Sequence, residues 1–295
     1  MDTVVLVDGS NMWYRCYVAT QFDKPGFPVY AMTRQIRKLC FHYGRDNVVV
    51  CWDAGRSGRK KLDPGYKAKR VAAEGVWEDL IYMKRMLASL GVKTAIKDGF
   101  EADDVIGTLA EKTDSPILIH STDKDFYQLI TDRVRVLRPR RKTHGKEIPE
   151  KIVCEGDVVE EFGCSPLKTL ILKAFRGDAS DNIPKIPLRF TKKFKECFTK
   201  ALDLSSNVEE FYSHVDLIDD KYKYEVITFK DRALLNEKLV TIMRGLDVSP
   251  VKTKMSEDKF LEVCKECEIK SLKFSDWTSI PKEPLPPPPV QRGLF

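Results

Sequence analysis

The sequence predicts an α/β fold with a mainly parallel sheet and helices on both of its faces. In the first half of the chain, short apolar runs of strand character alternate with longer stretches whose apolar residues recur at helical spacing. One of these helical stretches ends at Gly91, a residue type that is typical of helix C-termini. Alternation of this kind indicates a parallel sheet covered by helices.

The predicted elements follow one another as strand–helix–strand units. Strands are expected at residues 3–8, 47–53, 92–96, 115–121 and 134–137. Helices are expected directly after the first strand and at residues 29–44, 76–91 and 101–112. The last strand leads into a basic loop, RPRRKTHGK.

From about residue 150 onward the sequence is mostly helical in pattern. Residues 165–175, SPLKTLILKAF, are apolar nearly all round and are expected to be buried. Residues 281–290, PKEPLPPPPV, suit neither helix nor strand and are expected to form an extended, polyproline-type tether. We therefore expect an α/β core (1–150), a helical domain (151–280) and a Pro-rich tail (281–295).

The composition is that of a globular protein, with 42% hydrophobic and 32% charged residues in a chain of 295. The net charge of +6 permits a nucleic-acid partner without indicating one. Eight cysteines without a signal peptide predict reduced thiols in a cytoplasmic protein, and no apolar run approaches the roughly 18 residues of a membrane span. Cys264 and Cys267 form a CxxC with no second pair or nearby histidine, which favours ordinary thiols over structural zinc.

Two aspartates one residue apart, Asp123 and Asp125, follow the predicted strand at residues 115–121. They should lie at the strand's carboxyl end, where open α/β sheets bind their ligands. The stretch after them is expected to be a helix, so capping of that helix is an alternative role. The choice depends on whether other acids reach the same place.

Other acids follow the remaining strands. These are Asp8, Asp53, Glu101, Asp103 and Asp104. Because the carboxyl ends of parallel strands share one edge, all five are expected to meet the first pair in one crevice. Two more acids, Asp178 and Asp181 in GDASDN, are expected to open a later helix, where their i, i+3 spacing puts both on one face.

Nine carboxylates this close together would repel one another and raise each other's pKa values unless cations lay between them. Oxygen ligands without His or Cys select hard cations, Mg²⁺ or Mn²⁺. Two groups of acids suggest two ions, an arrangement that clamps a phosphodiester during in-line attack by water. Each motif taken singly could instead cap a helix or favour its N-terminus, but the whole set favours a metal site.

Five motifs, in order along residues 3–200, resemble those of the 5′-nuclease (flap endonuclease) family. They are LVDGSNMWYRCY (6–17), WDAGRSGRKKLDPGYKAKR (52–70), GFEADDVIGTLA (99–110), STDKDFYQLI (121–130) and FRGDASDNIPKIP (175–187). The family includes the 5′-nuclease domain of bacterial DNA polymerase I and stand-alone phage 5′-exonucleases. The resemblance implies a PIN-like fold and a metal-dependent nuclease acting on DNA with a 5′ flap, a nick or a free 5′ end, and on RNA primers in RNA–DNA hybrids.

The resemblance also implies a role for each acid. Asp8, Asp53, Glu101 and Asp103 are expected to hold a first metal ion, with Asp104 in a less direct position. Asp123 and Asp125 are expected between the ions, and Asp178 and Asp181 on the side of the second ion. We expect two Mg²⁺ ions, with Mn²⁺ able to replace them.

Residues 55–75 resemble the family's helical arch, through which the 5′ single strand passes. There Lys67 and Arg70 match the basic pair that contacts the scissile phosphate, and Tyr66 is expected to stack on a nucleobase. Cations beside the bond stabilise the charge that grows on the phosphate. A solvated basic helix is the alternative.

Residues 177–200 correspond to the family's helix–three-turn–helix, which grips duplex DNA, but they depart from its glycine-rich hairpin. Here KIPLRFTKKF has Lys185, Leu188 and Phe190 where glycines are usual, and their side chains would hinder close backbone approach. We therefore expect no potassium ion on the hairpin carbonyls. Duplex contacts are expected through the side chains of Arg189, Lys192 and Lys193.

The final residues, QRGLF, resemble the peptide by which replication proteins bind sliding clamps. Gln291 would hydrogen-bond, and Leu294 and Phe295 would fill an apolar pocket. An incidental tail is the alternative. The sequence thus predicts a monomeric, structure-specific 5′ nuclease of DNA replication and repair in the cytoplasm of a bacterium or phage-infected cell. The competing functions are a non-catalytic, clamp-associated DNA-binding protein of the same fold and an RNA-processing ribonuclease.

Overall fold

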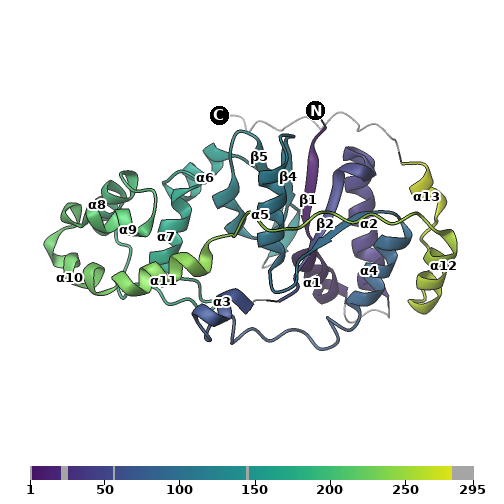
Figure 1. Cartoon of the computed structure of the whole chain (residues 1–295), viewed down its shortest axis with the longest axis horizontal. Helices are drawn as coiled ribbons and strands as arrows, with labels where there is room; N and C mark the ends of the chain where they lie inside the picture. Colours follow the sequence, from purple (N-terminus) through teal and green to yellow (C-terminus); the bar gives the residue numbers. More distant parts are fainter. Residues whose placement is uncertain (1, 21–25, 56, 144–145, 281–295) are drawn as a thin grey trace.

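The computed structural model describes residues 2–20, 26–55, 57–143 and 146–280, and its centre is a six-stranded sheet (Figure 1). The strands, in the order β3-β2-β1-β4-β5-β8, are β1 (Val4–Asp8), β2 (Val48–Trp52), β3 (Lys93–Ile96), β4 (Ile117–His120), β5 (Val134–Arg138) and β8 (Lys151–Val153). β1 to β5 are parallel, and β8 is antiparallel to β5. The predicted α/β fold is confirmed, and the carboxyl ends of β2, β1 and β4 are neighbours.

Side chains alternate along each strand between two apolar cores, one on each face of the sheet. Val5 and Val7 of β1 face the first core, and Leu6 faces the second. The first core is closed by α1 (Gly9–Thr20), α2 (Phe27–Tyr43) and α4 (Leu80–Ser89). The second is closed by α5 (Ala102–Lys112) and the 3₁₀ helix η2 (Lys124–Leu129), while the short η1 (Arg45–Asn47) links α2 to β2. Helices therefore cover both faces, as expected.

A small hairpin forms where a basic loop was expected. β6 (Arg141–Thr143) and β7 (Lys146–Ile148) pair in antiparallel fashion directly after β5, and β8 follows at the sheet's edge. These two short strands within the basic loop were not predicted from the sequence. Strands of three residues are too short to show a period in the sequence, so their pairing is decided by the neighbouring chain.

Residues 155–240 form a helical unit with an apolar core of its own. Its elements are α6 (Glu155–Phe162), α7 (Lys168–Arg176), α8 (Lys192–Asp203), α9 (Val208–Ser213), η3 (Val215–Leu217), α10 (Asp220–Thr228) and α11 (Lys230–Val240). α7 is not buried all round, contrary to expectation. Phe175 packs in the core against Phe198, with ring centroids 5.0 Å apart, while Lys173 lies on another face and Leu167 is 67% exposed.

The chain then returns to the α/β core (Figure 1, yellow). Val251 forms an isolated bridge with Thr94 of β3, and α12 (Glu257–Glu266) and α13 (Ser275–Thr278) pack on the first core through Phe260 and Trp277. This part of the expected helical domain 151–280 therefore lies with the sheet, and we propose that the helical unit ends with α11. Among the residues that the structure describes, no helix is both long and apolar enough to span a membrane.

Candidate metal centre

Five of the predicted acids line one cavity of about 480 Å³ at the carboxyl edge of the sheet. They are Asp8, Asp53, Glu101, Asp103 and Asp123. Asp8 is the last residue of β1 and Asp53 directly follows β2, so both side chains reach the edge because the strands end there. Since β2, β1 and β4 are adjacent, the fold brings together acids that are more than 100 residues apart.

Backbone and hydroxyl donors orient these carboxylates. Asp8 accepts hydrogen bonds from the Asn11 amide at 3.0 Å and from the Ser121 hydroxyl at 2.8 Å. Asp53 accepts from the Ala102 amide at 2.7 Å, at the start of α5. Asp123 caps η2 by accepting from the amide of Asp125 at 2.9 Å, so the alternative capping role is also filled.

The acids of this cavity disfavour each other's charge. Burial and the neighbouring Asp53 raise the pKa of Asp8 to about 7. Burial, Asp8 and Asp123 raise the pKa of Asp103 well above its ordinary value. Buried like charges that raise one another's pKa values are what a divalent cation with oxygen ligands relieves, so this donor set fits a hard metal ion.

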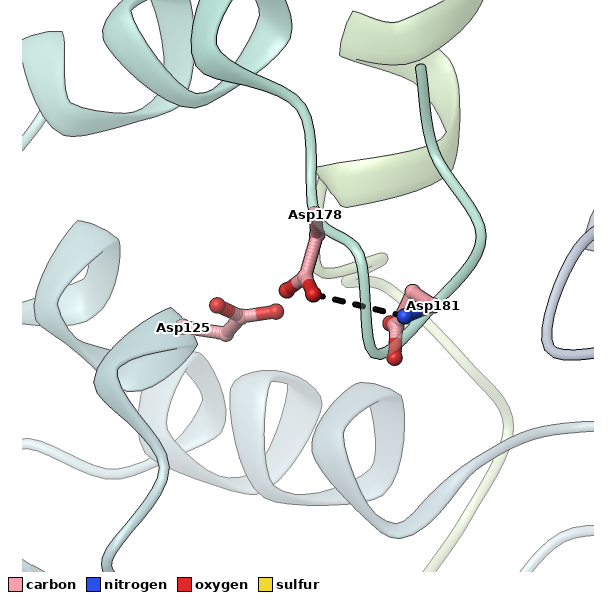
Figure 2. Close-up of side chains that lie close together, drawn as sticks. All are labelled: Asp125, Asp178 and Asp181. Carbon is pink, nitrogen blue, oxygen red and sulfur yellow. Dashed lines mark hydrogen bonds between the residues drawn. The ribbon is translucent and has the colours of Figure 1, made fainter. Parts of the chain in front are cut away.

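The second group of acids lies beside the first, where the helical unit meets the sheet. One carboxylate oxygen each of Asp125, Asp178 and Asp181 lie within 4.8 Å of one another, and Figure 2 shows the three side chains converging. Asp178 also accepts from the backbone amide of Asp181 at 3.3 Å (Figure 2). A cavity of about 500 Å³ is lined by Asp123, Asp125 and Asp178, so Asp123 borders both groups.

The residues GDASDN do not open a helix, contrary to expectation. Asp178 instead forms a bridge with Ile183, and the chain between them is a tight turn. Gly177 makes this turn possible, because its φ of +64° suits glycine and an added Cβ would lie 2.5 Å from the Ile183 carbonyl oxygen. The turn, rather than a helix face, directs both acids toward the site.

Asp104 does not line the metal cavity in this structure, and its expected indirect place in the metal site stays a prediction. Both of its oxygens accept from the Arg59 guanidinium at 2.7 Å, and one also accepts from the Met243 amide at 2.9 Å. Asp104 and Arg59 are 1% and 7% exposed. This bidentate pair ties α5 to α3 (Ser57–Leu62) and to the chain after α11.

Sequence reasoning missed two cations that belong to the site. Arg59 Nη1 contacts Glu101 at 3.0 Å in addition to its pairing with Asp104. Lys173 of α7 pairs with Asp125 and lies 2.9 Å from Asp178. In the sequence, Lys173 is the one charged residue in the apolar run LILKAF, and Arg59 begins the basic run RKK; these were the available signals.

Lys173 lowers the pKa values of both carboxylates that it contacts, but their other neighbours make the two values differ. Burial and Asp123 raise the pKa of Asp125 to about 6 against the opposing effect of Lys173. Burial also raises the pKa of Asp178, but Lys173 and the hydrogen bonds from Ser180 outweigh it and lower the value to about 2. The ammonium group thus supplies the second group with one positive charge.

The predicted arch segment lies against the acids. After the short α3 it continues as turns to Gly75, so the described part of residues 55–75 contains one six-residue helix. Lys67 Nζ lies 2.6 Å from Glu101 and 3.8 Å from Asp181, and Arg70 pairs with Asp181. Lys67 is 9% exposed, which rules out a solvated basic helix at this position.

Tyr66 does not present its ring for stacking on a nucleobase, contrary to expectation. It is 3% exposed, and its hydroxyl donates to Glu101 at 3.0 Å. The ring packs with Ile183 and Leu239, so the aromatic side chain anchors the segment to the helical unit.

The basic residues of the predicted hairpin lie apart from the metal cavities. Arg189, Lys192 and Lys193 are exposed around the start of α8, whose N-cap is Thr191. Phe190, at a position where the family has glycine, packs on Phe194 and Phe198 and so belongs to the helical core. Gln291, Leu294 and Phe295 lie outside the described residues.

Comparison with known proteins identifies a family for this chain. Residues 3–163 match the family described as 5′-3′ exonuclease, N-terminal resolvase-like domain. The chain belongs to this family. It is therefore a nuclease, and its sheet with acids at the carboxyl edge is the fold that the resemblance predicted.

Two relatives illustrate how much of the chain the likeness covers. The 5′-3′ exonuclease of Buchnera aphidicola subsp. Acyrthosiphon pisum is 29% identical over 285 residues, which are 89% of this chain and 93% of that protein. DNA polymerase I of Lactococcus lactis is 29% identical over 264 residues, which are 82% of this chain but 28% of the polymerase. The chain thus spans about a quarter of that polymerase.

Solved structures of the bacteriophage T5 enzyme share the fold. A 5′-exonuclease structure with bound zinc ions matches with a TM-score of 0.64 at 24% identity and covers 81% of this chain and 89% of that chain. The T5 flap endonuclease in a pseudo-enzyme–product complex with DNA and metal ions matches with a TM-score of 0.62 at 23% identity, and covers 81% and 88%.

Proposed function

We propose that this protein is a divalent-metal-dependent 5′ nuclease that hydrolyses phosphodiester bonds near the 5′ end of a strand at DNA junctions. The proposal rests on the observation that two clusters of acidic side chains lie side by side and that Asp123 lines the cavities of both. One group comes from the sheet edge, and the other combines Asp125 with the turn after α7. Two ions at such groups would activate the attacking water and neutralise the charge on the leaving oxygen.

The residues divide naturally between two ions. Asp8, Asp53, Glu101 and Asp103 would hold the first, Asp125, Asp178 and Asp181 the second, with Asp123 between them. Mg²⁺ fits the all-oxygen donor set, and Mn²⁺ should replace it. Asn11 and Ser121 hold Asp8 in position by direct hydrogen bonds, which restricts the carboxylate before any ion binds.

Lys67 and Arg70 would act on the substrate's phosphate. In this structure Lys67 forms an ion pair with Glu101, and Arg70 forms one with Asp181. Metal ions on these acids would weaken that attraction and leave both cations free to contact the scissile phosphate. Arginine and lysine remain charged near neutral pH, so they can stabilise the growing negative charge throughout the reaction.

The substrates we propose are DNA with a 5′ flap, a nick or a free 5′ end, and the RNA strand of an RNA–DNA hybrid, which suits primer removal in replication. The relatives named as 5′-3′ exonucleases and the T5 complex with DNA support the DNA part of this proposal. Arg189, Lys192 and Lys193 would contact the duplex from the start of α8. The QRGLF tail would bind a sliding clamp, and the protein would act as a monomer.

The test compares cleavage of 5′-labelled flap, nicked and RNA-primed duplexes with Mg²⁺, with Mn²⁺ and with EDTA. Asp53→Asn should lower the cleavage rate by more than about 100-fold, because loss of even an outer partner of a metal ligand costs 10–100-fold. DNA binding should be retained or tighter, since less negative charge faces the phosphates. The exposed Asp132→Asn is the matched control and should cleave normally.

Wild-type cleavage by purified Asp53→Asn would overturn the metal assignment. DNA binding by the wild type without cleavage of any substrate would favour the non-catalytic accessory protein.

A further inference from the structure

Three arginines meet at the carboxyl edge of the sheet, beyond the metal-site acids. Arg138 is the last residue of β5, Arg141 is the first of β6, and Arg15 lies on α1; we call them the arginine cluster. Arg15 Nη2 donates to the Arg140 carbonyl at 3.4 Å, which joins α1 to the β6–β7 hairpin. Arg138 Nη1 donates to the Tyr127 hydroxyl at 3.4 Å. Burial and, to a smaller extent, repulsion from Arg141 lower the pKa of Arg15.

The arginine cluster has no acidic partner in the described part of the chain. Within it, no carboxylate oxygen lies within the 4.0 Å ion-pair distance of any of the three guanidinium groups. The nearby Arg140, in contrast, pairs with Glu147, and Glu161 next to Tyr127 pairs with Lys124. The Nε atoms of Arg138 and Arg141 are buried and lack any hydrogen-bond partner. A buried donor without a partner costs free energy that an added acceptor would recover.

The cluster is continuous with the metal centre. β5 lies next to β4 and two strands from β1, so its end is about 10 Å along the edge from Asp8 at about 4.8 Å per strand. Arg15 is near enough to Asp8 for that carboxylate to raise its pKa. Asn11, Tyr14 and Arg15 share one face of α1 by their i, i+3, i+4 spacing, and the first two line the metal cavity.

We propose that the arginine cluster binds phosphodiester groups of the strand whose scissile phosphate lies at the metal centre. This rests on the proposed function, and it adds a contact one or two nucleotides from the cleaved bond. A guanidinium presents planar, paired donors that match a phosphate's oxygens. A bound phosphate would supply a negative charge next to these guanidinium groups, which have no carboxylate partner among the described residues.

The experiment measures binding of a 5′-flap substrate in EDTA, where no cleavage occurs, by wild type, Arg138→Gln and Arg141→Gln. Successive phosphates of the cleaved strand are replaced one at a time by uncharged methylphosphonate. One or two replacements should weaken wild-type binding but leave the variants unaffected, because the contact is already lost. The salt dependence, the slope of log K against log [salt], should fall by about 0.7 for each phosphate contact removed from a single strand.

Arg135→Gln is the matched control, since it makes the same change at an exposed position of the same strand. It should keep the wild-type response to every replacement. Arg138→Lys should retain part of the affinity that Arg138→Gln loses, because lysine keeps the positive charge but lacks the paired donors of a guanidinium. The thermal unfolding midpoint of each variant is measured alongside, so that a misfolded variant is recognised and the Lys variant is used instead.

An unchanged response to every methylphosphonate in folded Arg138→Gln and Arg141→Gln would overturn the proposal, as would an equal effect in Arg135→Gln. Failure of the proposed function has a different signature. In that case the wild type would not cleave the unmodified flap with Mg²⁺, whatever the binding experiment shows.

Discussion

The negative charge on Asp8 is strongly disfavoured by its surroundings in the metal centre. Its carboxylate is buried, lies near Asp53 and Asp123, and has a pKa raised to about 7. The pKa of an aspartate in the unfolded chain is near its ordinary value of about 3.9. In the metal-free protein the folded state therefore binds a proton at Asp8 that the unfolded state has already lost.

This difference predicts a pH dependence of stability. A raised pKa contributes stability that is complete below the unfolded value and disappears as the pH rises through the folded value near 7. Metal-free wild type should thus lose stability between pH 5 and pH 8 relative to Asp8→Asn, whose side chain stays neutral, with most of the loss below pH 7. Thermal unfolding midpoints of the two proteins in EDTA at both pH values measure it.

The comparison between variants cancels groups such as His120, which burial and Arg15 shift to a pKa of about 4. Mg²⁺ should stabilise the wild type more than Asp8→Asn at pH 8. A difference between the two midpoints that does not change with pH would contradict the assigned cause.

Asp103 and Asp104 show how adjacent residues of one type acquire different roles. Asp103 lines the metal cavity, whereas Asp104 is held by both arms of Arg59. Helix geometry turns successive side chains about 100° apart, so two neighbouring acids at a helix start face different surroundings. One faces the cavity and the other faces buried chain from α3 and α11.

Removal of Arg59 should therefore affect the fold first. Arg59→Met leaves Asp104 buried without its partner, and breaking a buried pair typically costs about 3–5 kcal/mol of unfolding free energy. Urea unfolding at pH 7 measures the loss. Arg59→Met with Asp104→Leu should recover much of it, because both charges are then absent; a single variant as stable as wild type would show that the pair is not structural.

At the scale of the element, the segment from α3 to Gly75 forms a cover on the acids. Tyr66 anchors it by burial, and Lys67 and Arg70 reach Glu101 and Asp181. Lys67 has a φ of 52°, an uncommon conformation for a lysine that the surrounding contacts must hold. The segment's conformation and the charge state of the acids are thus coupled.

If Lys67 and Arg70 contact the scissile phosphate, each alanine variant should slow cleavage by about 100-fold or more at saturating enzyme, the usual cost of one stabilising donor. Lys69→Ala is the matched control, because Lys69 is exposed in the same segment. Single-turnover rates separate this effect from affinity. A variant with weaker, salt-dependent binding but an unchanged maximal rate would limit these cations to attracting DNA.

At the scale of the whole molecule, the site exists only where two units meet. Asp125 comes from the sheet side, while Asp178, Asp181 and Lys173 come from the helical unit. The side chain of Asn236 in α11 donates hydrogen bonds to the carbonyls of Ala174 and Pro184, at 2.7 and 2.8 Å, and so holds the turn that carries Asp178 and Asp181. The separation of the two carboxylate groups is therefore set by packing between the units.

We propose that the Pro-rich tail, residues 281–295, lies outside the catalytic function and serves to bind a sliding clamp. Deleting residues 291–295 should leave cleavage of short, naked oligonucleotides unchanged and reduce only the stimulation by a sliding clamp. The tail would raise the local enzyme concentration at clamp-bearing junctions without adding to the catalytic site. Titration of the clamp with full-length and truncated protein measures this; equal binding would eliminate the tether.

The sequence by itself determined the five parallel strands, the order of strands and helices in the first half, and the set of acids at the sheet's edge, but not the antiparallel sixth strand β8. These follow from local patterns, since periods of two and 3.6 residues are visible within a few residues. The convergence of Asp8, Asp53 and Asp123 followed as well, because parallel strands necessarily end at one edge.

Only the tertiary structure decided which charges pair. Arg59 reaches Asp104 across 45 residues of sequence, and Lys173 reaches Asp125 across 48. It also buried Tyr66, returned α12 to the sheet and, within the described residues, left the Nε atoms of Arg138 and Arg141 without hydrogen-bond partners. Burial and ion pairing depend on which distant segments of the chain pack together, and a local sequence pattern does not contain that information. The acids of the site could therefore be predicted from the sequence, whereas the cations that pair with them could not.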